Sequence, residues 1–124
     1  MKTVLIVDDE PDIRALVALC LDHLRVEVLQ AAGLTGALNI ARANDVGLVL
    51  LDLALGSEDG LEILPELRRE PRLSGAPVVA FSAHDSRRRE ALDHGMDSFL
   101  KRPFTSAELR STVELYLGTP TDGE

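Results

Sequence analysis

Acidic, hydroxyl and basic side chains end the short apolar runs of this 124-residue chain. The runs cover residues 4–7, 48–51 and 78–81, and a weaker one covers 98–101. The side chains that end them are Asp8, Asp9, Asp52, Ser82, Lys101 and Arg102. Runs of this length that are apolar on both faces are typical of central strands in a parallel sheet. Open parallel sheets bind ligands beyond the carboxyl ends of their strands, so we expect these side chains to share one rim.

The residue types on this rim favour phosphoryl chemistry that depends on a divalent cation. Carboxylates from Asp8, Asp9 and Asp52 would repel one another and raise each other's pKa unless a cation lay between them. Mg²⁺ prefers oxygen ligands and keeps several waters. A metal and a basic side chain can neutralise the oxygens of a phosphoryl group while a carboxylate attacks in line. Asp52 ends a fully apolar run, an unusual place for a carboxylate without a function.

Helical patterns alternate with the apolar runs, to which residues 26–29 add another. The first predicted helix begins near Pro11 and turns one face inward. That face comprises Ile13, Leu16, Val17, Cys20 and Leu24. Shorter patterns predict helices around residues 34–41, 61–67 and 86–94, the last of these ending at Gly95. Thr105 and Glu108 have the spacing of a capping box and open a final helix.

This order predicts a doubly wound, flavodoxin-like α/β fold with a five-stranded parallel sheet and five helices. We expect one domain over residues 1–118 and a polar tail over residues 119–124. With 45% hydrophobic and 27% charged residues, the composition is that of an ordinary globular domain.

The net charge and the cysteine content limit the kinds of partner and cellular compartment that we expect for this chain. The net charge of −8 argues against direct contact with nucleic acid and favours a divalent cation or a cationic partner surface. Cys20 is the single cysteine, and no apolar stretch approaches the roughly 20 residues that span a bilayer. We therefore expect a cytoplasmic protein without a signal peptide or a membrane contact.

Four stretches resemble, in order and spacing, the motifs of CheY-like receiver domains of two-component response regulators. They are VLIVDDEPDIR, LVLLDLALGSEDGLEIL, PVVAFSAHDS and GMDSFLKRPF. The resemblance implies a switch domain whose Asp52 accepts a phosphoryl group from a histidine kinase or a histidine phosphotransfer protein. It implies a Mg²⁺ site made of Asp8, Asp9, Asp52 and the backbone carbonyl of Ala54.

The same resemblance implies a conformational response to phosphorylation. Ser82 is similar to the switch hydroxyl that bonds the phosphate, and Phe99 to the aromatic side chain that changes burial with it. His84 and Ala54 occupy positions that shape access of the attacking water. The surface around Phe99 and Arg87, Arg88 and Arg89 is the expected contact for a downstream protein or an attached output domain.

Two departures from the family pattern bear on the site. Gly56 replaces a usual proline, so we expect the segment 56–60 to be looser. Arg102 precedes Pro103 where the family has lysine, and Lys101 lies one residue early. A one-residue shift in a strand points the side chain to the opposite face, so either Arg102 takes the basic role or a bulge brings Lys101 in.

Simpler interpretations stand beside the functional ones. Asp8 and Asp9 could be solvated loop acids, Ser82 an ordinary strand-end hydroxyl, and Phe99 a core side chain. The three arginines could form a solvated helix face. The domain could be a degenerate receiver that binds partners without phosphorylation. A small phosphatase would need a second acid where Ala54 stands, so we expect a regulatory domain and not an enzyme acting on a separate metabolite.

Overall fold

The computed structural model describes residues 2–22 and 24–118, so the predicted polar tail lies outside the described residues. The strands are β1 (Lys2–Val7), β2 (Val26–Ala31), β3 (Leu48–Asp52), β4 (Ala54–Leu55), β5 (Glu58–Asp59), β6 (Val78–Ser82) and β7 (Ser98–Lys101). The helices are α1 (Pro11–Cys20), α2 (Leu34–Ala43), α3 (Gly60–Arg69), α4 (Arg88–Asp93) and α5 (Ser106–Leu117). A 3₁₀ turn, Asp85–Arg87, leads into α4.

Five strands form one parallel sheet in the order β2-β1-β3-β6-β7. The chain steps outward from β1 to β2 and then returns to place β3 on the other side of β1. This reversal is the topological switch point of a doubly wound sheet, where ligand sites form. The predicted fold class is confirmed.

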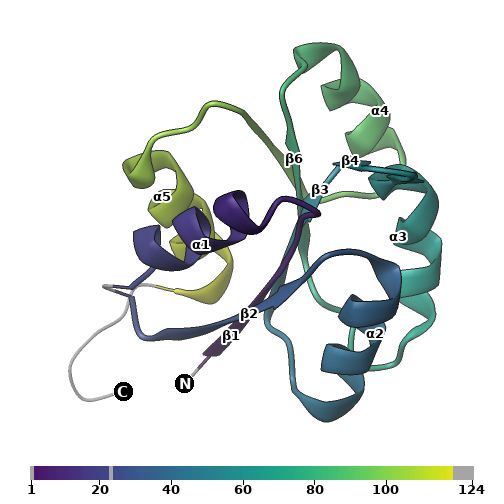
Figure 1. Cartoon of the computed structure of the whole chain (residues 1–124), viewed down its shortest axis with the longest axis horizontal. Coiled ribbons are helices and arrows are strands. Elements are labelled where there is room, and N and C mark those ends of the chain that lie inside the picture. The colour runs from purple at the N-terminus through teal and green to yellow at the C-terminus, as the bar shows by residue number, and fades with distance from the viewer. Residues whose placement is uncertain (1, 23, 119–124) are drawn as a thin grey trace.

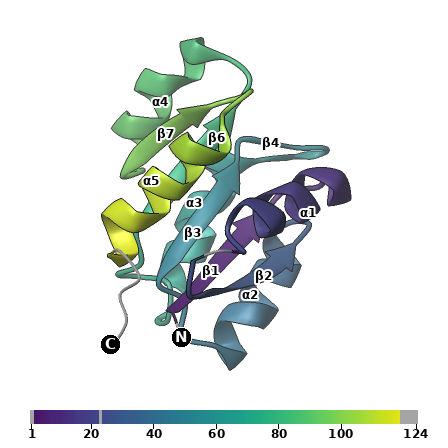
Figure 2. The same cartoon turned by 90° about the vertical axis from the view of Figure 1, so that its left-hand side faces the viewer.

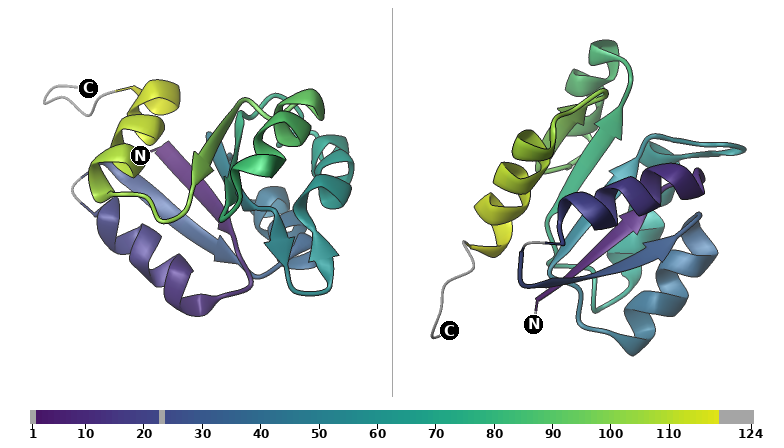
Figure 3. Two further views of the ribbon diagram at one scale, coloured as in Figure 1. Left: turned by 90° about the horizontal axis from the view of Figure 1, so that it is seen from above. Right: turned by 60° about the vertical axis from the view of Figure 1, so that its left-hand side comes forward.

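Helices cover both faces of the sheet (Figures 1 and 2). Helices α1 and α5 pack on one face against Val4, Ile6, Leu50 and Phe81. The right-hand view of Figure 3 shows these two helices together on the near side of the sheet. Helices α2, α3 and α4 cover the other face, over the alternate side chains of the same strands. Strands β1, β3 and β6 are therefore buried on both faces, which explains their continuous apolar runs.

The ends of two helices follow the sequence signals. Thr105 Oγ1 accepts a hydrogen bond from the Glu108 amide, and the Glu108 carboxylate accepts one from the Thr105 amide. These reciprocal bonds form the predicted capping box at the start of α5. Gly95 follows the end of α4 with a φ of 92°, a left-handed conformation that glycine adopts without strain.

Three details differ from the sequence predictions. Strand β2 is a half-buried edge strand, because among the residues that the structure describes it pairs only with β1. In α1 only Val17 is fully buried, whereas Leu16 is 47% exposed and Cys20 is half-buried, so the helix contacts the core along a narrower stripe than its apolar pattern indicates. The segment after Asp52 forms a β4–β5 hairpin that alternation did not predict, because each strand has only two residues.

Candidate functional site

The predicted rim residues lie at the carboxyl ends of β1, β3, β6 and β7. Asp52 is opposite Phe81 in the register of β3 and β6, and Ser82 is opposite Lys101 in that of β6 and β7. The amide of Arg102 donates to the Ser82 carbonyl at 2.7 Å, which continues the pairing by one residue. The sheet thus brings together residues that are up to 94 positions apart in the chain, between Asp8 and Arg102.

Two carboxylates of the rim are fully buried. Asp8 and Asp52 have 0% exposure, and each has one oxygen bound by a backbone amide two residues on. Glu10 N lies 2.9 Å from Asp8 Oδ1, and Ala54 N lies 3.1 Å from Asp52 Oδ1. The Oδ2 atoms of both carboxylates have no hydrogen-bond partner among the described residues. Buried carboxylate oxygens without partners are costly, which marks this point as one built for a ligand.

Arg102 supplies the cation at this point. Its Nη2 donates to Asp52 Oδ1 at 2.9 Å, and its Nη1 lies 3.6 Å from Asp8 Oδ2. The Arg102 side chain is only 18% exposed. Lys101 instead points to the surface, where its ammonium lies 3.2 Å from Asp85. Of the two basic residues that the sequence left open, the structure therefore brings Arg102 to the carboxylates.

The acids carry perturbed pKa values. Burial raises the pKa of Asp8 from 3.8 to about 6, and the nearby Asp52 adds to the rise, while the Glu10 amide and Arg102 oppose it. Burial also raises the pKa of Asp52 against the opposing effects of the Ala54 amide and Arg102. The sequence predicted that these acids would raise each other's pKa by repulsion, whereas burial is the larger cause in the structure.

The raised pKa of Asp8 predicts a stability that falls with rising pH when no metal is present. Folded Asp8 keeps its proton up to about pH 6, whereas the unfolded chain loses it near 3.8, so its contribution is full below 3.8 and lost through 6. Asp8→Asn should therefore gain on the order of 1–3 kcal/mol over the wild type at pH 8, and much less at pH 4. Urea unfolding in EDTA at both pH values measures this; parallel stability curves would contradict it.

The acidic group at the end of β1 has the donors of a cation site. Carboxylate oxygens of Asp8, Asp9 and Glu10 lie within 4.8 Å of one another, Asp8 buried and the other two exposed. Together with the buried carboxylate of Asp52, this all-oxygen set fits Mg²⁺. Glu10 was missed as a candidate, although the run Asp8-Asp9-Glu10 was its signal. Arg14 donates to the Asp8 carbonyl at 2.6 Å, and no pattern in the sequence indicated this contact.

The two predicted switch residues lie on neighbouring strands, Ser82 at the end of β6 and Phe99 within β7 opposite Ala80. The Ser82 hydroxyl is held within its own loop, where it accepts from His84 N at 3.1 Å and donates to His84 O at 3.4 Å. The His84 side chain is exposed. Phe99 is 6% exposed in the core cluster under α4, and the Arg88 guanidinium lies 4.8 Å from its ring centroid.

Arg87 does not belong to a solvated helix face. Its Nη2 lies 3.2 and 3.0 Å from the two carboxylate oxygens of Asp59, and its Nε lies 3.0 Å from Glu90. These contacts raise the pKa of Arg87, although partial burial opposes the rise. The interpretation of the three arginines as one solvent-facing set is therefore wrong for Arg87.

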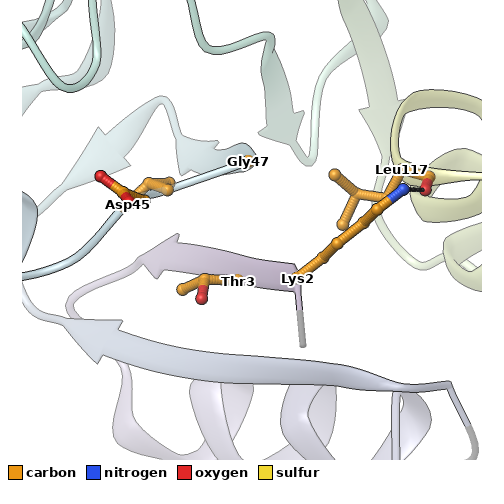
Figure 4. Close-up of a pocket in the computed structure, with 6 residues that line it drawn as sticks. Lys2, Thr3, Asp45, Gly47 and Leu117 are labelled. Atoms are coloured by element: carbon orange, nitrogen blue, oxygen red, sulfur yellow. Dashed lines mark hydrogen bonds between the residues drawn. The ribbon is translucent and has the colours of Figure 1, made fainter. Parts of the chain in front are cut away.

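A separate hollow lies at the opposite, amino end of the sheet (Figure 4). Its lining includes Lys2, Thr3, Gly47 and Leu117. The Lys2 ammonium donates to the Leu117 carbonyl, and Asp45 at its edge pairs with Arg72 at 2.9 Å. Both charges are already partnered, so this hollow adds nothing to the chemistry of the rim.

Among the residues that the structure describes, no helix is long and apolar enough to cross a bilayer.

Comparison with known proteins identifies the family. A family model described as the response regulator receiver domain matches residues 4–114. The chain is 35% identical over 119 residues to the KDP operon transcriptional regulatory protein KdpE of Escherichia coli (strain K12), covering 94% of this chain and 52% of that protein. It is 29% identical over 125 residues to the phosphate regulon transcriptional regulatory protein PhoB of Pseudomonas aeruginosa, covering 99% and 55%. The chain thus spans about half the length of the curated relatives it matches.

Two solved structures illustrate the shared fold, and the second of them bears on the site. Chemotaxis protein CheY4 of Vibrio cholerae matches with a TM-score of 0.86 and 25% identity, covering 94% of this chain and 99% of that one. The receiver domain of sensor histidine kinase PA1611 from Pseudomonas aeruginosa matches with a TM-score of 0.83 and 26% identity, covering 95% and 98%. It is described with a magnesium ion coordinated in its active site cleft. With its fold, its rim of acids and these relatives in agreement, the chain belongs to the response regulator receiver domains of two-component signal transduction.

Proposed function

We propose that the domain is a phosphorylation-controlled switch that accepts a phosphoryl group on Asp52 from a histidine kinase or a histidine phosphotransfer protein. The observation that carries this proposal is the buried Asp52 carboxylate, whose Oδ2 has no hydrogen-bond partner among the described residues and which lies beside Asp8 and Arg102. A nucleophile with one anchored and one unbound oxygen is oriented for attack.

The reaction forms one bond and breaks one. Asp52 Oδ2 attacks the phosphorus, the new O–P bond replaces the P–N bond of the donor phosphohistidine, and the electron pair leaves with the imidazole. The Ala54 amide and Arg102 hold Oδ1 during the attack. Asp8, Asp9, Asp52 and the Ala54 carbonyl would hold Mg²⁺, which supplies charge neutralisation at the phosphoryl oxygens when bound. The magnesium ion described in the active site cleft of the PA1611 receiver supports a magnesium site at this rim.

Signalling then follows from a shift in conformer populations. We propose that the Ser82 hydroxyl leaves its loop to bond the phosphate and that Phe99 changes burial as β7 and α4 rearrange. The exposed His84 acts on the access of water that ends the phosphorylated state. Arg87, Arg88, Arg89 and Phe99 surround the surface that responds.

The output is a downstream protein or an attached domain. The transcriptional regulators among the relatives, of which this chain spans about half, support an attached output domain. The net charge of −8 supports a role without direct nucleic-acid contact by this domain. The single cysteine supports a cytoplasmic location.

A second function is favoured by one contact. Because Arg102 pairs with Asp52 Oδ1 and Asp8 Oδ2, it competes with a metal for carboxylate oxygens of the site. A degenerate receiver that binds partners without phosphorylation is the function that this contact would support.

Incubation with acetyl phosphate and Mg²⁺, followed by intact-mass spectrometry, separates the two functions. A switch gains the mass of one phosphoryl group, and neither Asp52→Asn nor an EDTA-treated sample gains it. Asn keeps the size of the side chain and its bond to the Ala54 amide, so the variant isolates the nucleophile. A folded wild type that stays unmodified with acetyl phosphate and with a phosphorylated histidine phosphotransfer domain would establish the degenerate receiver instead.

A further inference from the structure

Two loops that end at neighbouring strands are fastened to each other by one arginine. Arg87 closes the 3₁₀ turn after β6, on the segment that begins with Ser82. Its guanidinium reaches the β4–β5 hairpin, where Nη2 binds both oxygens of Asp59, and its Nη1 lies 3.5 Å from the Leu53 carbonyl. Figure 1 shows the hairpin just below α4 in that view. We call the Arg87–Asp59 pair the clasp.

The acidic half of the clasp is fixed against the backbone of Asp52. Asp59 is the N-cap of α3 and accepts from the Leu61 amide at 2.9 Å. The Gly60 amide donates to the Leu53 carbonyl at 2.9 Å, and a Cβ on Gly60 would lie 2.5 Å from the Asp52 carbonyl oxygen. This close approach, which only glycine allows, sets Asp59 at a defined distance from the phosphoacceptor.

The basic half of the clasp holds the segment that carries the switch hydroxyl. Between Ser82 and Arg87 lie only four residues, and the Ser82 hydroxyl is bound within them by His84. The next residue, Arg88, lies over the Phe99 ring, so adjacent arginines attach the start of α4 to the Asp52 side and to β7. The clasp is partly shielded, since the Arg87 side chain is 25% exposed, and both hydrogen bonds from Nη2 to Asp59 are charge-assisted.

We propose that Arg87 is a positioning residue: by pairing with Asp59 it holds the Ser82–Arg87 segment in its unphosphorylated arrangement and so sets the population of the signalling conformer. The inference rests on the proposed function and adds its regulation. When Ser82 moves toward a phosphate on Asp52, the segment between Ser82 and Arg87 moves with it. The clasp opposes this movement because it holds Arg87 at the other end of the segment. Release of the clasp therefore favours the signalling conformer, and linkage requires that the same release favour phosphorylation.

Two conservative variants remove the clasp from opposite sides. Arg87→Met keeps the aliphatic stem, and Asp59→Asn keeps an N-cap for α3, because Asn caps as well as Asp. Arg89→Met is the matched control: it removes the same charge two residues away, from a side chain that is 89% exposed. Amide hydrogen exchange without phosphodonor or metal should show opening of residues 83–88 increased about fivefold to tenfold in either clasp variant and unchanged in the control.

The double variant and phosphorylation complete the experiment. Arg87→Met/Asp59→Asn should exchange no faster than Arg87→Met alone, because Asp59→Asn removes only a pairing that Arg87→Met already abolishes. Acetyl phosphate should modify the single clasp variants several-fold faster than the wild type, an effect that general destabilisation would not produce. Exchange equal to that of Arg89→Met, additive effects in the double variant, or phosphorylation slowed in the clasp variants would each overturn the inference. If the wild type is never phosphorylated but exchange follows the clasp, the proposed function fails while the mechanical coupling stands.

Discussion

Asp9→Ala is expected to lose Mg²⁺-dependent phosphorylation while it stays folded. Asp9 is exposed at the end of β1, and a carboxylate oxygen of it lies within 4.8 Å of those of Asp8 and Glu10. Its loss removes an anionic donor from the metal site without opening a cavity, because Asp8 and not Asp9 is buried. Mg²⁺ holds few protein oxygens, so losing one should weaken binding by at least about tenfold.

Calorimetric titration with Mg²⁺, together with intact mass after acetyl phosphate, measures this effect. Asp12→Ala is the matched control, since it removes the same charge in the first turn of α1. Glu10→Ala tests the third acid of the cluster, which lies beside the same oxygens. Unchanged Mg²⁺ binding in Asp9→Ala would remove Asp9 from the site, and a loss confined to Glu10→Ala would transfer its role to Glu10.

The sequence predicted the sheet because its central strands are buried on both faces. Strands β1, β3 and β6 carry four consecutive apolar residues each, and runs of this length that end in polar residues favour buried strands. The polar residues that end these runs then indicated the rim, because the carboxyl ends of neighbouring parallel strands lie at one edge of the sheet. Edge strand β2 and the two-residue strands β4 and β5 carry no comparable pattern, so their burial and pairing required the folded chain.

Side-chain contacts between different loops could not be predicted from the sequence. The apposition of Arg87 and Asp59 depends on how two loops end at neighbouring strands, and no periodicity records it. The basic residue of the rim was a choice between two neighbours, Lys101 and Arg102, on opposite sides of the chain. The direction that each takes is fixed by the end of β7, where Lys101 pairs with Asp85 and Arg102 turns to Asp52.

Arg102→Lys is expected to speed phosphorylation of Asp52. In the wild type the guanidinium contacts Asp52 Oδ1 and Asp8 Oδ2 together, which favours the ionised form of Asp52 but places a planar fork on the same carboxylate as the attacking Oδ2 and on an oxygen that the metal would use. A lysine ammonium is a compact charge that can neutralise the arriving oxygens without spanning both carboxylates. Loss of one charge-assisted contact in the resting state corresponds to a gain in rate of several-fold to about tenfold.

Lys101→Ala is the matched control for this substitution, and the pair decides which basic residue serves the site. Lys101 contacts Asp85 on the surface, and such a pair is worth at most about 1 kcal/mol, so its loss should leave the rate unchanged. The measurement is the rate of intact-mass gain with acetyl phosphate at saturating Mg²⁺, so that altered metal affinity does not enter. Arg102→Ala should be slower than Arg102→Lys, because the arriving charge then meets no basic side chain from this position. If Lys101→Ala abolishes phosphorylation and Arg102→Lys changes nothing, Lys101 reaches the site during the reaction, and the Arg102–Asp52 contact belongs only to the resting state.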